Sequence, residues 1–274
     1  MKHIYFVFVV FSKKDYFCQK QKHFPTYMPK YYFLSDAHIG TQIVENVREH
    51  EKRLVDWLEM VRHDATEIFL VGDIFDFWFE YKSCIPKGYN RLLGKLAEIT
   101  DNGVKVHFFI GNHDLWTFGY LEQEIGLTVY KSPQVFELLG YRFFVTHGDG
   151  VNDKSRVFRI TRKLFHSRMM QKCFGFIHPN IGISVAKNLS NNNRKKHSYV
   201  PYKGEENEPL ILFASNYSAD NSIDYFVFGH RHIVLNMQIA SGSRVVILGD
   251  FYEEFSYAVF DENGLSIENF IANQ

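Results

Sequence analysis

Short apolar runs and amphipathic stretches alternate along the first half of the chain. Tyr31–Ser35, Ile68–Val71 and Val104–Ile110 are apolar runs with the length and composition of buried strands. Between them, apolar residues recur at helical spacing, which predicts one helix over about 45–62 and another around Leu92–Ile99. Strands that alternate with helices in this way predict a parallel sheet covered by helices.

Strands follow one another more closely in the second half. Phe136–Leu139 and Arg142–Thr146 are joined through Gly140, which predicts a hairpin. A helix is predicted over 209–218 and a strand over Tyr225–Phe228. The last strands are predicted near 233–239, 244–248, 255–260 and 264–270. Together with the first half, this order predicts an α/β protein with mixed sheets.

The first thirty residues do not share this pattern. Ile4–Phe11 is an apolar run that could be the core of a signal peptide or an anchor. Charged residues from Lys13 follow it directly, however, and no small-residue cleavage site appears. We therefore expect 1–30 to be a loosely attached N-terminal extension, with Met28 as an alternative start, and 31–274 to form the folded domain.

Charge is distributed unevenly along the 274 residues, although 31 Lys and Arg balance 31 Asp and Glu. Residues 151–203 carry twelve basic and one acidic side chain, a net +11, and the first thirty carry a net +5. The remainder carries −16, so a basic insert interrupts an acidic body. An acidic body can hold cations, and a basic insert favours an anionic partner.

Two features of composition limit the environment of the protein. Its three cysteines lack the spacing of a metal site and do not form an even set, which favours a reducing compartment. No apolar run approaches the length of about 18 residues that a membrane-spanning helix needs. We therefore expect a cytoplasmic protein without a spanning helix.

Five of the predicted strands end in the same way, in small residues mixed with Asp, Asn or His. Ligands of open α/β sheets bind at the carboxyl ends of the strands, so we expect these segments to converge. A single histidine after a strand is usually a core residue, but five such endings predict a shared metal site. The segments are Ser35-Asp36-Ala37-His38, Gly72-Asp73, Gly111-Asn112-His113-Asp114, Thr146-His147-Gly148-Asp149 and Gly229-His230-Arg231-His232.

The side chains in these segments indicate which metals would bind. Carboxylate, carboxamide and imidazole ligands without thiolate suit Mn²⁺, Zn²⁺ or Fe. Seven candidate ligands are too many for one ion and enough for two. Two ions close together, with a bridging carboxylate, are suited to displacement at phosphorus.

In this order, the five segments resemble the calcineurin-like metallophosphoesterase superfamily. The resemblance implies two mixed β-sheets packed together and flanked by helices, with a helical lid insert over 151–203. It also implies two divalent metal ions, for which we expect Mn²⁺, with Zn²⁺ or Fe as alternatives. One ion would be held by Asp36, His38 and His232, the other by Asn112, His147 and His230, and Asp73 would bridge them.

A closer resemblance is carried by two stretches. Gly72–Trp78, which reads GDIFDFW, and His147–Gly150, which leads into the basic insert, resemble the UDP-2,3-diacylglucosamine hydrolase family of lipid A biosynthesis. That family implies cleavage of UDP-2,3-diacylglucosamine to UMP and 2,3-diacylglucosamine 1-phosphate, with the insert holding the acyl chains. The best-known branch of the family has Arg at the position of His113, where this chain keeps the general superfamily residue.

Two other functional hypotheses remain beside this one. The first is a metal-dependent phosphodiesterase that acts on another substrate, such as nucleic acid or a nucleotide. The second is a scaffold that kept the fold and lost the chemistry, which the complete set of ligand residues argues against. In either enzyme, we expect His113 to stabilise charge or protonate the leaving oxygen. Asp114 would orient His113, or cap the following turn.

The basic insert suggests what the substrate is like. Basic and aromatic residues interleave at helical spacing within it, which is typical of a helix at an anionic membrane surface. We expect Arg159, Arg162 and Lys163 to contact an amphiphilic nucleotide-sugar lipid, and the protein to lie peripherally at the inner face of the cytoplasmic membrane. A solvated basic face is the plainer alternative. Nucleic acid is not expected, because phosphate contacts alone do not call for so many apolar residues.

Overall fold

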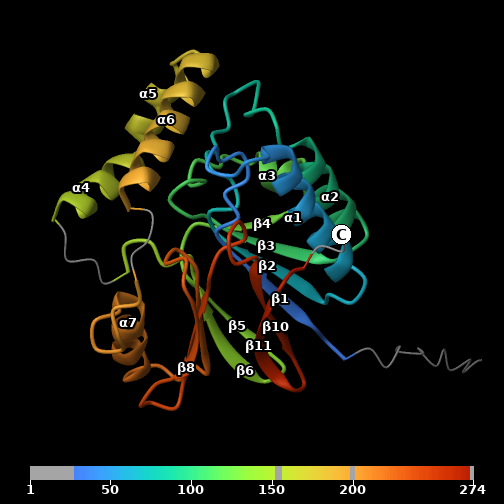
Figure 1. Cartoon of the computed structure of the whole chain (residues 1–274), viewed down its shortest axis with the longest axis vertical. Helices are drawn as coiled ribbons and strands as arrows, with labels where there is room; N and C mark the ends of the chain where they lie inside the picture. The colour runs from blue at the N-terminus through green and yellow to red at the C-terminus, as the bar shows by residue number, and fades with distance from the viewer. Residues whose placement is uncertain (1–27, 152–155, 198–200, 272–274) are drawn as a thin grey trace, which may run out of the picture.

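Two mixed β-sheets pack face to face in the computed structural model, which describes residues 28–151, 156–197 and 201–271 (Figure 1). This arrangement confirms the predicted fold class. The six strands of the first sheet lie in the order β11 (Gly264–Asn269), β10 (Ser256–Asp261), β1 (Tyr31–Leu34), β2 (Glu67–Val71), β3 (Lys105–Phe109) and β4 (Thr128–Tyr130). The second sheet has the order β5 (Gln134–Leu138), β6 (Tyr141–Val145), β7 (Tyr225–Phe228), β9 (Arg244–Leu248) and β8 (Val234–Gln238).

The direction of the strands decides where the loops gather. In the first sheet, β1 pairs parallel to β2, β2 to β3 and β3 to β4, whereas β10 and β11 are antiparallel additions. In the second sheet, β6, β7 and β9 are parallel, with β5 and β8 antiparallel at the edges. Each sheet therefore has a central parallel set whose carboxyl ends lie together.

Successive side chains of each strand face opposite sides of its sheet, which builds two kinds of core. Phe33, Phe69 and Phe143 lie between the sheets, where the ring centroids of Phe33 and Phe69 are 4.6 Å apart. Tyr32 and Leu34, the neighbours of Phe33, face the helices on the outer side of the first sheet. This alternation determines the register of the strands, because a shift of one residue in either direction would turn the wrong side chains toward each core.

Helices cover the outer faces of both sheets. α1 (Val47–Val61) and α2 (Asn90–Asp101) pack on the first sheet, and α7 (Pro209–Ser218) packs on the second. Asn46 caps α1, because its side chain accepts hydrogen bonds from the amides of Arg48 and Glu49 at 3.1 Å. The remaining helix of the body, α3 (Tyr120–Gln123), is a single turn beside β4.

The predicted elements match the observed ones closely, with two omissions. The hairpin predicted around Gly140 is formed by β5 and β6. They pair antiparallel, with Leu138 opposite Tyr141 beside the turn. The sequence did not predict α3 or β4, since four and three residues are too short to show a period. The N-terminal extension predicted over 1–30 lies mostly outside the described residues, so it stays a prediction.

The insert is helical, as predicted. It consists of α4 (Arg156–Phe165), α5 (Arg168–Gly175) and α6 (Pro179–His197), which Figure 1 shows together at one end of the sandwich. The indole of Trp116 donates a hydrogen bond to the carbonyl of Phe165 at 2.8 Å, and the ring of Phe174 lies 4.7 Å from that of Trp116. Among the described residues, no helix is both long and apolar enough to cross a membrane.

Candidate metal centre

The five predicted segments all leave the carboxyl ends of parallel strands and meet at one edge of the sandwich. We call them together the ligand rim. Those after β1, β2 and β3 come from the first sheet, and those after β6 and β7 come from the second. Hydrogen bonds join neighbouring segments, as from the amide of Asp36 to the carbonyl of Gly72 at 3.0 Å. The topology therefore brings together residues almost 200 positions apart.

One group of three side chains lies on the first side of the rim. Asp36 Oδ1 is 3.6 Å from His38 Nε2 and 3.2 Å from His232 Nε2. The rings of His38 and His232 stack with their centroids 5.2 Å apart. These are the three residues predicted to hold the first ion, and they lie close enough to share one.

A second group lies beside the first and contains Asp73, His147 and His230. Asp73 Oδ2 is 3.3 Å from His147 Nε2 and 3.9 Å from His38 Nε2 of the first group. Asp73 thus stands between the two groups, where a bridging carboxylate is needed. Asn112, the remaining predicted ligand, is exposed in the adjoining segment.

The atoms of the rim are arranged as metal ligands require. Asp36 Oδ1 is fully buried and accepts no hydrogen bond among the described residues, which a protein tolerates when an ion takes that place. His147 Nδ1 donates to the carbonyl of Val71 at 2.9 Å, so its Nε2 faces Asp73. His232 Nδ1 lies 2.9 Å from the hydroxyl of Tyr252, which leaves its Nε2 toward Asp36. Such outer partners hold imidazole ligands in orientation, so the residues fit divalent metal ions.

Burial and neighbouring charges shift the pKa values of the rim side chains in different directions when no ion is bound. Burial acts against ionisation of Asp73, but the imidazoles of His147 and His113 hold its pKa well below the usual range. Burial likewise opposes the charge on His147, but Asp73 raises the pKa of that imidazole well above its ordinary value. Burial and the neighbouring His147 lower the pKa of His230 to about 4. Burial raises the pKa of Asp36.

The backbone of the rim is strained at the ligands themselves. Seven residues other than glycine have positive φ in the described parts of the chain, and five of them are predicted ligands. Such conformations cost about 1–3 kcal/mol each and persist where the surroundings determine them. The five are Asp36 (φ 52), His38 (φ 45), Asp73 (φ 54), His230 (φ 68) and His232 (φ 50).

Glycines allow the segments to approach one another this closely. A Cβ placed on Gly111 would lie 2.6 Å from the amide nitrogen of Asp73 and closer still to its carboxylate. A Cβ on Gly229 would lie 2.6 Å from Asp36 Oδ2. Since real Cβ atoms do not approach so near, both positions require glycine for the carboxylates to reach the rim.

Asp114 supports the rim from behind. Its carboxylate accepts hydrogen bonds from the amides of Gly111 at 2.7 Å, Ile74 at 2.8 Å, and Asp73 and Phe75 at 3.3 Å. Burial, followed by the charge of Asp73, raises its pKa to about 7. The carboxylate therefore faces the backbone of the Asp73 segment and not the imidazole of His113, whose orientation was one of the two roles predicted for it.

His113 is held by a residue that the sequence analysis missed. Its Nδ1 donates to the backbone carbonyl of Asp76 at 2.8 Å, and its amide donates to Asp73 Oδ1 at 2.8 Å. Its ring meets that of His38 edge-on at 4.8 Å. Asp76 belongs to the GDIFDFW stretch and follows Asp73 closely in the sequence. That proximity could have indicated that Asp76 lies near the site.

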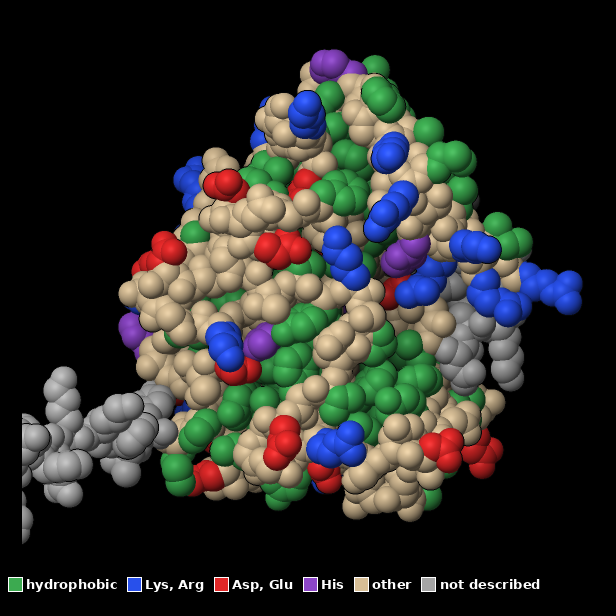
Figure 2. All heavy atoms as spheres, turned by 180° about the vertical axis from the view of Figure 1, so that it is seen from behind, with side chains coloured by type: hydrophobic (Ala, Val, Ile, Leu, Met, Phe, Trp, Pro, Cys, Tyr) green, Lys and Arg blue, Asp and Glu red, His purple; other side chains and the backbone are tan. Residues whose placement is uncertain are grey.

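Arg159, Arg162 and Lys163, which we predict to contact the substrate, line a cavity of about 770 Å³ beside α4. Figure 2 shows Lys and Arg side chains gathered over this end of the molecule. Arg162 Nε donates to Asp149 Oδ2 at 2.9 Å, two residues after His147. An adjoining cavity is lined by Arg162 and reaches Gly111 on the rim. Arg162 thus reaches the ligand rim through Asp149.

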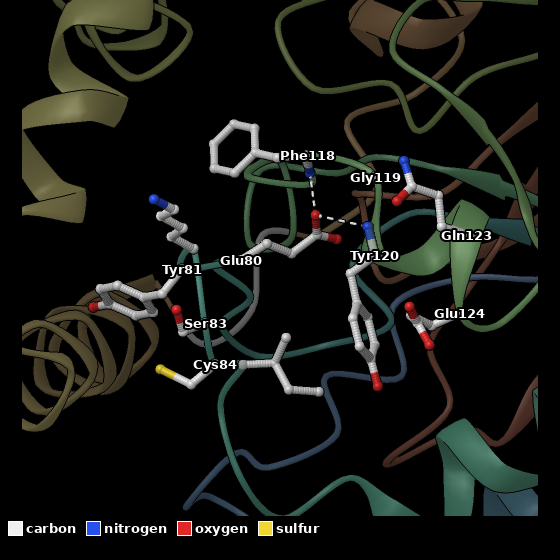
Figure 3. Close-up of a pocket in the computed structure, with 11 residues that line it drawn as sticks. Glu80, Tyr81, Ser83, Cys84, Phe118, Gly119, Tyr120, Gln123 and Glu124 are labelled. Carbon is white, nitrogen blue, oxygen red and sulfur yellow. Dashed lines mark hydrogen bonds between the residues drawn. The ribbon is translucent and has the colours of Figure 1, made fainter.

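A further pocket of about 550 Å³ lies to one side and contains none of the predicted ligands (Figure 3). Its polar centre is Glu80, whose carboxylate accepts from the amides of Phe118 and Tyr120 and from the indole of Trp78 at 3.1 Å. Glu80 is therefore satisfied within the protein, where it ties two loops together. Chemistry is expected at the rim and not in this pocket.

Comparison with known proteins places these residues in a wider context. The sequence pattern of the calcineurin-like phosphoesterases matches residues 29–234. A UDP-2,3-diacylglucosamine hydrolase of Porphyromonas gingivalis is 39% identical over 254 residues, which cover 88% of this chain and 97% of that protein. Enzymes of the same name from Shewanella baltica and Photorhabdus laumondii are 21% and 22% identical, over 86% and 87% of this chain and 95% and 98% of theirs. The matched residues include the whole ligand rim.

Proposed function

The chain belongs to the calcineurin-like phosphoesterase family, and from that premise we propose that it hydrolyses the diphosphate of UDP-2,3-diacylglucosamine. The products would be UMP and 2,3-diacylglucosamine 1-phosphate. The observation that carries the proposal is the pair of adjacent ligand groups with Asp73 between them, directly beside a basic and apolar insert. The names of the relatives support the choice of substrate.

Two divalent ions, for which we expect Mn²⁺, would be held by the two groups and Asn112. When bound, they would supply Lewis-acid stabilisation of the phosphoryl oxygens and activate water. The rest of the rim prepares that site. Asp114 fixes the Asp73 segment through three of its backbone amides and also binds the amide of Gly111. The strained ligand conformations hold the carboxylates and imidazoles in position before any ion binds.

His113 would act on the substrate beside the metal ligands. Because its Nδ1 donates to the carbonyl of Asp76, Nε2 is the nitrogen left for the substrate. Its ring lies against His38, so a phosphoryl group at the rim would be within its reach. We assign to His113 the stabilisation of developing charge or the protonation of the leaving oxygen.

The insert supplies surfaces for the two halves of an amphiphile. Arg159, Arg162 and Lys163 offer positive charge beside the rim, suited to phosphate oxygens. Apolar side chains of α4, α5 and α6 face outward. The most exposed in the insert is that of Phe176, directly after α5, with 91% of its surface accessible. Others are Ile160, Leu164, Met169, Ile181, Val185 and Leu189. We assign these to the acyl chains and to peripheral contact with an anionic membrane, at its cytoplasmic face.

A phosphodiesterase acting on nucleic acid is the second candidate. The basic side chains of α4 favour it, because they would also bind a phosphate backbone. The exposed apolar residues of α5 and α6 weigh against it, since a sugar-phosphate backbone offers them no partner. The amphiphilic substrate uses both features and is preferred.

The test is hydrolysis of UDP-2,3-diacylglucosamine in mixed micelles with Mn²⁺, followed by mass spectrometry of the products. We expect UMP and the diacyl sugar phosphate, with ¹⁸O from labelled water on one of them. Faster turnover of single-stranded DNA or a cyclic dinucleotide would instead establish the second candidate.

A matched pair of variants tests the basic side chains. Lys163→Ala should raise KM for the lipid substrate several-fold. Lys52→Ala, at an exposed lysine of α1 away from the rim, should leave it unchanged. Equal KM values for both variants would show that Lys163 does not contact the substrate.

A further inference from the structure

Helix α6 of the insert has two faces of different character. Ile181, Val185 and Leu189 are exposed at 59%, 50% and 57%, which gives an outward apolar stripe. The other face packs on the body, where Ile183 and Ala186 join the aromatic cluster of Phe77, Phe79 and Trp116. A Cβ on Gly182 would meet Tyr81 Oη at 2.6 Å, which shows how closely this face approaches.

Ser190 is the polar end of the inward face. It is 8% exposed and reaches into the metal centre from the insert. Its hydroxyl donates to Asp76 Oδ1 at 3.1 Å and lies 3.5 Å from His113 Nδ1. Asp76 itself is 2% exposed, so this hydrogen bond lies in the interior.

We propose that Ser190 is a positioning residue for His113, supplied by the insert to the reaction carried out at the rim. The inference rests on the proposed two-metal hydrolysis, and it adds the residue through which the insert acts on the chemistry. Ser190 acts through Asp76 and His113 and need not touch the substrate.

The distances give the physical reason. Asp76 offers His113 two acceptors: the backbone carbonyl at 2.8 Å and the carboxylate Oδ1 at 3.9 Å. The Ser190 hydroxyl occupies Oδ1, so the imidazole is left with the carbonyl, whose position the fold fixes. Without that hydroxyl, Oδ1 of the buried carboxylate would lose this donor and would compete with the carbonyl for His113 Nδ1–H. The ring would then leave the orientation that turns Nε2 to the substrate.

The arrangement also links the insert to catalysis. Ser190 reaches Asp76 only while the inward face of α6 lies on the aromatic cluster of the body. Displacement of α6 would therefore remove this contact and free the ring of His113 to turn. Seating of α6 and alignment of His113 become one event.

The experiment compares two serines of the same helix with Mn²⁺-loaded protein. Ser190→Ala should lower kcat about tenfold, as loss of such an outer contact does, with KM and metal content unchanged. Ser184→Ala removes an exposed serine of α6 and should have no effect. Ser190→Thr keeps the hydroxyl and should restore most of kcat. Both UDP-2,3-diacylglucosamine and the small ester bis(p-nitrophenyl) phosphate are used.

The two substrates separate the possible results. An equal loss of kcat on both supports action through His113. A raised KM on the lipid substrate alone would mean that Ser190 contacts the substrate, and would overturn the proposal. If the wild type cleaves only the small ester, the proposed substrate is wrong while Ser190 is still tested.

A spectroscopic readout does not depend on activity. Long-range ¹⁵N–¹H spectra of the zinc-loaded protein, assigned with His113→Gln, should show the proton of His113 on Nδ1. We expect that signal to shift or exchange faster in Ser190→Ala and to stay unchanged in Ser184→Ala. An unaltered His113 signal in Ser190→Ala, together with wild-type kcat, would overturn the proposal.

Discussion

The ligand rim and the insert are built on opposite principles. Ligands such as Asp36, which is completely buried, sit on strained backbone at one edge of the two sheets, and the carboxylate of Asp114 supports that backbone from behind. The insert exposes large apolar side chains, among them Met169 at 73% and Phe176 at 91%. The rim is therefore determined by the fold, whereas the insert presents a surface that calls for a partner.

Hydrogen bonds join the insert to the rim and to the body beside it. Trp116 binds the carbonyl of Phe165, Arg162 binds Asp149, and Ser190 binds Asp76. Changes in the rim should therefore abolish hydrolysis of every substrate. Changes in the insert should act mainly on the amphiphilic one, except at Ser190, where the insert reaches His113.

The largest effect is expected at Asp73, which lies between the two ligand groups. Asp73→Asn keeps the shape of the side chain and removes the charge between His147 and His38. We expect kcat to fall on the order of a thousand-fold or more on both the lipid substrate and bis(p-nitrophenyl) phosphate. Asp56→Asn, at an exposed position of α1, is the matched control. Activity near wild type with normal metal content would contradict a two-metal site.

The next effect concerns the backbone of the rim. Gly111→Ala places a Cβ against the amide and carboxylate of Asp73, and overpacking of this kind costs about 1–3 kcal/mol. We expect roughly a hundred-fold loss of kcat, because the bridging carboxylate has to move, with a lower melting temperature. Gly94→Ala, on α2, where a Cβ meets nothing, is the control. Equal activities for the two variants would show that the rim is less rigid than its geometry indicates.

The ligand set and the body of the fold were within reach of the sequence. β7 and α7 have the predicted bounds, because Tyr225–Phe228 and 209–218 are apolar runs set off by polar neighbours. The ligands follow their strands directly, so their meeting point depends only on the topology of a parallel sheet. Local pattern and one rule of architecture were therefore sufficient to bring these segments together.

The supporting contacts were not within reach. Ser190 and Asp76 are 114 residues apart and meet only because α6 packs on an aromatic cluster. Asp114 was predicted either to orient His113 or to cap the following turn, but its carboxylate accepts from backbone amides of its own and the neighbouring segment. Such contacts depend on tertiary packing, which leaves no period or motif in the sequence.

Acidity provides a third way to separate the regions. Asp73 raises the pKa of His147 well above its ordinary value despite burial, so at pH 7 the metal-free rim holds a proton that an ion must displace. Mn²⁺ affinity should therefore fall as the pH is lowered, with release of about one proton on binding at pH 7. Calorimetry in two buffers of different ionisation enthalpy measures that number.

The metal-free protein should show the opposite trend. A group whose pKa is raised on folding contributes stability at low pH and loses it as the pH rises through the folded pKa. We expect the melting temperature in EDTA to fall as the pH rises above the pKa of an ordinary histidine. His147→Gln should abolish this fall. His166 of the insert, whose pKa is lowered by burial and by Arg162, is the control, and His166→Gln should leave the fall in place.

The smallest effect is expected where the insert meets the body. Trp116→Phe keeps an aromatic ring in the cluster and removes the hydrogen bond to the carbonyl of Phe165, worth about 1 kcal/mol. We expect KM for the lipid substrate to rise about fivefold and hydrolysis of bis(p-nitrophenyl) phosphate to stay unchanged. Trp57→Phe is the control, because the buried indole nitrogen of Trp57 has no hydrogen-bond partner among the described residues. The lost hydrogen bond holds α4, while Ser190 and its contact with Asp76 belong to α6. Equal KM values for the two variants would therefore mean that α4 is held by its apolar contacts alone.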